Sequence, residues 1–94
     1  MSHPVGAPLR DRIVVEFVEA DVEIGFHLVD MAESERAQGN LPRFSRVLAD
    51  AEEVFHDIER RLHRTGVRER ESLQPLVAEL RREIDSARVR YHQD

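Results

Sequence analysis

The feature that most constrains the fold of this chain is a long helical segment, residues 9–38, with apolar side chains around roughly two thirds of its circumference. On a helical wheel, an ordinary amphipathic face is bordered by further apolar arcs. The first face carries Ile13, Phe17, Ala20, Ile24, Leu28 and Met31, and the adjoining arcs carry Val14, Val18, Gly25, Val29, Ala32, Val15, Val22 and Phe26. Only a narrow wedge is polar, and Glu16, Glu19, Glu23 and Asp30 make it acidic. A small monomeric bundle cannot bury so wide an arc, so the segment predicts an assembly surface.

A glycine turn is expected to close this first helix. Gly39 can adopt the left-handed conformation that ends a helix, and Asn40 can cap a second helix over 41–64 with Pro42 in its first turn. Because the connection is so short, the two helices are expected to pack as an antiparallel hairpin.

A second break at Gly66 predicts a third helix over 73–92. Ser72 is a good capping residue, and Pro75 is expected in the first turn. Each of these two helices has one narrow apolar stripe: Phe44, Val47, Leu48, Ala51, Val54, Phe55, Ile58 and Leu62 in the second, and Leu73, Leu76, Val77, Leu80, Ile84, Ala87 and Tyr91 in the third. We therefore expect an all-α, up-down-up three-helix bundle, a single domain over 9–94 preceded by a flexible arm over 1–8.

The predicted helix lengths locate the excess apolar surface. The first helix spans about 45 Å and the second about 35 Å, which leaves residues 9–17 partly uncovered. We expect a homodimer or larger homo-oligomer that assembles through this helix. The expected interface residues are Ile13, Val14, Val15, Phe17, Val18, Val22, Phe26 and Val29.

Composition argues against catalysis, cofactors and membranes. The chain has no cysteine, which excludes disulfides and thiolate metal sites, and it has neither a nucleophile elbow nor a glycine-rich phosphate loop. Glu53 and His56 have the Glu-x-x-His spacing of di-iron bundles, but Glu53 lies opposite the apolar stripe, on the expected solvent side. No apolar run approaches the roughly 20 residues that cross a bilayer. We expect a cytoplasmic protein that is not an enzyme and has no cofactor or metal.

The alternative function that the sequence suggests lies at an arginine-rich turn over residues 60–70. The chain has no lysine, and its candidate anion or partner patch is Arg60, Arg61, Arg64, Arg68 and Arg70. The patch predicts a small regulatory module that binds an anionic ligand or nucleic acid. Cations are also favoured at a helix C-terminus by the macrodipole, and the net charge of −5 disfavours nucleic acid. A protein-interaction or scaffold module that self-associates is therefore the preferred prediction.

Residues 24–62 resemble a degenerate tetratricopeptide-like hairpin. The resemblance is carried by Met31-Ala32 in one helix, the run from Ala37 to Leu41 at the turn, and Leu48 and Ala51 in the next helix. It implies a role in binding other proteins through a groove between helices, and it implies no catalytic residues.

Overall fold

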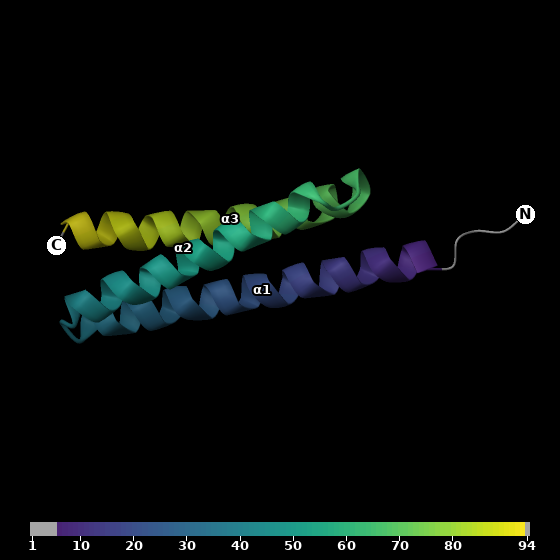
Figure 1. The fold of residues 1–94 in the computed structure, drawn as a ribbon. Coiled ribbons are helices and arrows are strands. Elements are labelled where there is room, and N and C mark those ends of the chain that lie inside the picture. Colours follow the sequence, from purple (N-terminus) through teal and green to yellow (C-terminus); the bar gives the residue numbers. More distant parts are fainter. Residues whose placement is uncertain (1–5, 94) are drawn as a thin grey trace, which may run out of the picture.

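In the computed structural model, the chain folds into three α-helices joined by short turns: α1 (Gly6–Ala37), α2 (Leu41–His63) and α3 (Val67–Gln93) (Figure 1). The structure describes the backbone of residues 6–93 and the side chains of residues 12–90. The predicted all-α three-helix bundle is confirmed, and each helix runs back along the one before it (Figure 1). α1 begins at Gly6 rather than at Leu9, and residues 1–5 of the expected arm lie outside the described residues.

The bundle is a rod rather than a sphere. Its principal extents are 62 × 16 × 15 Å, and its radius of gyration is 16.2 Å, against about 12 Å for a compact domain of this length. α1 is the longest helix, with 32 residues, and its N-terminal end continues past the turn between α2 and α3 (Figure 1). One end of α1 therefore has less cover from the other helices.

The turn between α1 and α2 has the predicted glycine closure. Gly39 has φ 79, its amide donates to the Arg36 carbonyl at 3.0 Å, and the Asn40 amide donates to the Glu35 carbonyl at 2.9 Å. These two bonds form a Schellman motif, which satisfies carbonyls at the end of α1. The Asn40 Oδ1 atom then accepts a hydrogen bond from the Arg43 amide at 3.3 Å, so Asn40 caps α2 as expected.

The start of α3 differs from the prediction. The helix begins at Val67, so the charged segment expected to be a connection forms its first turns, and Pro75 lies inside the helix. Arg and Glu are good helix formers, and Glu69 in the first turn is favoured by the positive end of the helix dipole. The Arg70 amide donates to the Gly66 carbonyl at 3.0 Å, which fixes the beginning of α3 before Ser72.

One apolar core runs along the rod between the three helices. α1 contributes Val18, Val22, Val29 and Ala32, and the other two helices contribute Phe44, Val47, Leu48, Ala51, Phe55, Ile58, Leu62, Leu73, Val77, Leu80, Ile84 and Ala87. Gly25 is also buried, and a Cβ atom added there would lie 2.7 Å from the Leu80 Cδ2 atom. Because Gly25 has no side chain, α1 and α3 can approach closely at this point.

Ion pairs connect every pair of helices. Asp21 in α1 accepts a bond from Arg61 in α2 at 2.7 Å, and Glu33 in α1 accepts one from Arg90 in α3 at 2.9 Å. Glu52 in α2 is bound by both terminal nitrogens of Arg81 in α3, at 2.7 and 3.1 Å. The geometry of Arg81 is the bidentate one that holds a carboxylate most specifically.

Candidate interaction surface on helix α1

A row of apolar side chains lies on the outside of α1. The exposed fractions are 42% for Ile13, 58% for Phe17, 51% for Ile24 and 36% for Met31. Ala20 is also exposed and Leu28 is half-buried. Successive members are three or four residues apart, so they form one face of the helix. We call this face the outer seam and define it as Ile13, Phe17, Ala20, Ile24, Leu28 and Met31.

The predicted interface needs a correction, because part of it is core. Val18, Val22 and Val29 are at most 2% exposed, and they pack between the helices of the same chain. Val14, Val15 and Phe26 are half-buried against that core. Among the predicted interface residues, only Ile13 and Phe17 are well exposed.

The interface prediction missed Ile24, Met31, Ala20 and Leu28, which belong to the outer seam. Small and β-branched residues face α2 and α3 instead, because Gly25 lets the helices come close. A glycine in the middle of a long helix was the sequence signal for this arrangement, since it lowers helix stability unless close packing needs it.

A hollow of about 250 Å³ opens beside the outer seam at the less covered end of α1, and Val14, Phe17, Arg61 and Arg64 line it. The Arg61 guanidinium carbon lies 5.7 Å from the centre of the Phe17 ring, a cation–π contact, while its Nη1 atom bonds Asp21. Phe17 is thus held from one side by α2 and remains open on the other side.

The arginine patch predicted for residues 60–70 does not form one cluster. Arg60 pairs with Asp57 on the surface of α2, and Arg61 pairs with Asp21. Arg70 donates from Nε to the Leu62 carbonyl and from Nη2 to the Thr65 carbonyl, both at 3.1 Å, so it satisfies the C-terminal end of α2.

Two members of that patch remain available. Arg64 and Arg68 are exposed, and within the described part of the chain neither has an ion pair. Asp57 lies three residues from Arg60 on the same helix, so the sequence could have suggested that pair. The partners of Arg61 and Arg70 lie on α1 and on the backbone, where the sequence could not place them.

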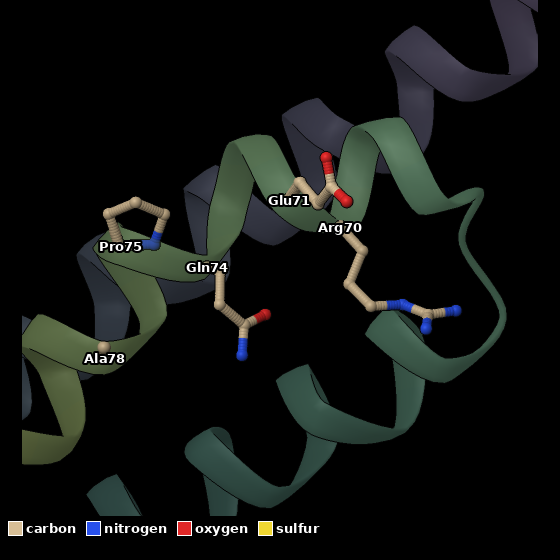
Figure 2. A pocket seen from close by; sticks show the side chains of 5 residues that line it. All are labelled: Arg70, Glu71, Gln74, Pro75 and Ala78. Atoms are coloured by element: carbon tan, nitrogen blue, oxygen red, sulfur yellow. The ribbon is translucent and has the colours of Figure 1, made fainter.

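A second hollow, of about 460 Å³, lies along the first turns of α3 (Figure 2). Its lining residues are Arg70, Glu71, Gln74, Pro75 and Ala78, and Figure 2 shows the Arg70 side chain reaching toward the end of α2. Apart from half-buried Arg70, these side chains are exposed. Arg70, the one cation among these lining residues, is already bonded to backbone carbonyls, so it is not available to an anionic ligand.

Glu53 and His56, which have the di-iron spacing, both lie on the exposed surface of α2. The His56 ring contacts Glu59 at 3.3 Å and Glu52 at 3.7 Å. Over residues 12–90, no group of three or more His, Asp or Glu side chains is placed to hold a metal ion.

Among the side chains that the structure describes, two carboxylates have shifted pKa values, and both form ion pairs between helices. Hydrogen bonds from Arg81 lower the pKa of Glu52 to about 2, and Arg88 acts in the same direction against the effect of burial. Partial burial acts to raise the pKa of Glu33, but its bonds from Arg90 and Arg36 outweigh that effect and lower it. Both shifts favour the charged, paired state that holds the bundle together.

Comparisons with protein-family models, with curated proteins and with solved structures found no match to this chain. The tetratricopeptide-like resemblance therefore stays a prediction. Among the described residues, no helix has the length and apolarity needed to cross a membrane.

Proposed function

We propose that this chain is a non-enzymatic protein-interaction module that self-associates through the outer seam of α1. The observation that carries the proposal is the row of apolar side chains exposed along the longest helix, with Phe17 and Ile24 each more than half exposed. Contiguous apolar surface of this kind usually marks an interface.

The spacing of the outer seam favours a second copy of the same chain as the occupant. Phe17, Ile24 and Met31 recur every seven residues, and Ala20 lies between the first two. A repeat of this kind lets equivalent side chains from two helices interdigitate, as in coiled coils. A two-fold dimer is the commonest way in which a chain covers such a face with itself. The expected location in the cytoplasm remains part of the proposal.

Solution mass tests the proposal directly. At micromolar concentrations, we expect sedimentation equilibrium to give a dimer for the unmodified chain and a monomer for Ile24→Glu, because the substitution places a charge in the middle of the seam. Val89→Glu is the matched control: Val89 is 53% exposed, close to the 51% of Ile24, but lies on α3. A monomeric mass for the unmodified chain, or equal dimerisation of Ile24→Glu and Val89→Glu, would overturn the proposal.

The alternative function, binding of an anionic ligand or nucleic acid at the turn over 60–70, has less support. Three of its five arginines have partners within the chain, which leaves Arg64 and Arg68. No single observation favours an anion over a second copy, so self-association is the function we propose.

A further inference from the structure

We infer that the two copies pair with their α1 helices parallel and in register, so that the acidic strip of each α1 faces arginines on the partner's α2. The inference rests on the proposed self-association and adds its geometry. It follows from the charges on the two sides of the outer seam and from the symmetry of a dimer.

The two sides of the outer seam differ in charge. On one side, about 100° around the helix, lies an acidic strip made of Glu16, Glu19, Glu23 and Asp30, with Arg12 as its one cation. All of these side chains are exposed.

The other side of the seam is covered by α2. The α1 residues that bond Arg61 and Arg43 of α2 are Asp21 and Glu35. Asp21 lies about 40° from Phe17 around the helix, and Glu35 lies about five turns beyond Phe17, in line with the end of the seam. The charged residues along this edge of α2 are Arg43, Arg46, Asp50, Asp57, Arg61 and Arg64. Arg43, Arg61 and Asp57 already have partners. The rest of the edge is Arg46 and Arg64 against Asp50, an excess of one arginine.

Symmetry then decides between the two orientations. A two-fold axis along parallel helices exchanges the two sides of the seam, so each acidic strip meets the partner's α2 edge. A two-fold axis perpendicular to antiparallel helices brings like sides together, which places acid against acid and arginine against arginine. Like charges repel and opposite charges attract, so the parallel arrangement is favoured.

The levels of the charges along the rod agree with a parallel, in-register pair. Arg64 lines the hollow with Val14 and Phe17, so it stands at the level of the partner's Glu16 in that arrangement. Arg43 bonds Glu35, and Arg46 is about one turn further along α2, near the level of the partner's Asp30. Within the described side chains, Glu16, Asp30, Arg46 and Arg64 have no ion pair in their own chain.

Single cysteines test the orientation, because the natural chain has none. Ile13 and Met31 lie at opposite ends of the outer seam, about 27 Å apart along the helix. In a parallel dimer, Ile13→Cys and Met31→Cys should each cross-link with itself through a short bis-maleimide, and a mixture of the two should give no mixed product. Val89→Cys on α3 is exposed to a similar degree and should remain uncross-linked.

The outcomes separate this inference from the proposed function. A dimeric mass with cross-links only between Ile13→Cys and Met31→Cys would show antiparallel pairing and overturn the inference while keeping the proposed function. A monomeric mass, or a dimer that cross-links at neither position, would overturn both.

A charge exchange provides a second test that does not use cysteine. Arg64→Glu should weaken dimerisation about tenfold at low salt, because it replaces two symmetric attractions by repulsions. Adding Glu16→Arg to the same chain should restore the affinity, since the two charges meet across a parallel interface. Failure of the second substitution to restore affinity, with the dimer otherwise intact, would contradict the pairing.

Discussion

At the scale of single residues, Arg70 shows how one side chain can end one helix and support the start of the next. Its guanidinium donates to the Leu62 carbonyl, which also accepts the Thr65 amide at 3.1 Å, and to the Thr65 carbonyl just beyond the end of α2. Thr65 contributes a further bond from its hydroxyl to the Arg61 carbonyl at 2.7 Å. The turn between α2 and α3 is therefore held by these side-chain bonds together with backbone bonds from the Arg64 and Thr65 amides.

We expect Arg70→Ala to lower the free energy of unfolding by about 1–2 kcal/mol, because it leaves these carbonyls without a charged donor. Urea titration followed by circular dichroism would measure the change. Arg68→Ala is the matched control, since Arg68 is exposed on the same turn, and it should change stability by less than about 0.5 kcal/mol. Equal effects of the two substitutions would contradict a capping role for Arg70.

The sequence could group the arginines near this turn but could not separate their roles. Helix dipole arguments treat Arg60, Arg61 and Arg64 alike, since all lie near the end of one helix. In the folded chain, Arg61 reaches Asp21, forty residues away, and Arg60 reaches its neighbour Asp57. The Arg60 pair is local to α2, whereas the Arg61 pair depends on the packing of α1 against α2, which is a long-range property.

At the scale of the helices, the contact between α1 and α3 at Gly25 determines which side of α1 becomes core. An alanine at this position would place its Cβ atom 2.7 Å from Leu80 Cδ2 and 3.0 Å from Leu80 Cδ1. Leu80 is fully buried, so its side chain has little space into which to move.

We expect Gly25→Ala to destabilise the bundle by about 1 kcal/mol. The gain in helix propensity is about 1 kcal/mol, and overpacking of a core costs about 1–3 kcal/mol. In the background of Leu80→Ala the same substitution should become stabilising, because the cavity accommodates the new methyl group. Urea titrations of the four proteins give this cycle, and stabilisation of the unmodified chain by Gly25→Ala would contradict the close contact.

The order and number of the helices could be predicted from the turn residues. The rotation of α1 about its own axis, which decides which face of the helix is buried, could not. Gly39 ends α1 and Asn40 caps α2 through hydrogen bonds to residues close in the sequence, so their roles could be predicted, and both predictions are confirmed. The rotation of α1 depends on α2 and α3, which contact the arc with Gly25 and leave Ile24 outside. Residue size alone favours burial of the outer seam, because Phe17, Ile24 and Met31 are larger than the valines and glycine that face the core.

At the scale of the whole molecule, Glu52 connects α2 to α3 through two arginines that lie seven residues apart on α3. It is bound by Arg81 and Arg88, and the Arg81 guanidinium also lies over the Phe55 ring at 4.8 Å and bonds Asp85. These bonds lower the pKa of Glu52 to about 2 from its usual 4.5. The ion pairs between Glu52 and α3 therefore depend on pH in the acid range.

We expect the contribution of Glu52 to be present above pH 4.5 and to be lost as the pH falls toward 2, because the folded state binds the proton more weakly than the unfolded state does. Allowing for solvent screening, that contribution is about 1–2 kcal/mol. Glu52→Gln imitates the protonated side chain, so its stability should be lower at pH 6 and converge with that of the unmodified chain near pH 2. Thermal unfolding across this range measures the difference, and Glu53→Gln, an exposed change on the same helix, should show none. A constant gap between Glu52→Gln and the unmodified chain would contradict the pH dependence.

We expect self-association through the outer seam to make the stability of the folded chain depend on protein concentration. Only the folded chain presents the outer seam, so dimerisation through it stabilises the folded state by mass action. Above the dissociation constant, each tenfold increase in concentration should raise Tm by roughly 3–5 °C for a domain of this size. Ile24→Glu should melt at a temperature independent of concentration, while Val89→Glu should follow the unmodified chain. A concentration-independent Tm in a reversible transition of the unmodified chain would mean that folding and association are not linked, and the exposed seam would then be a tolerated feature of a monomer.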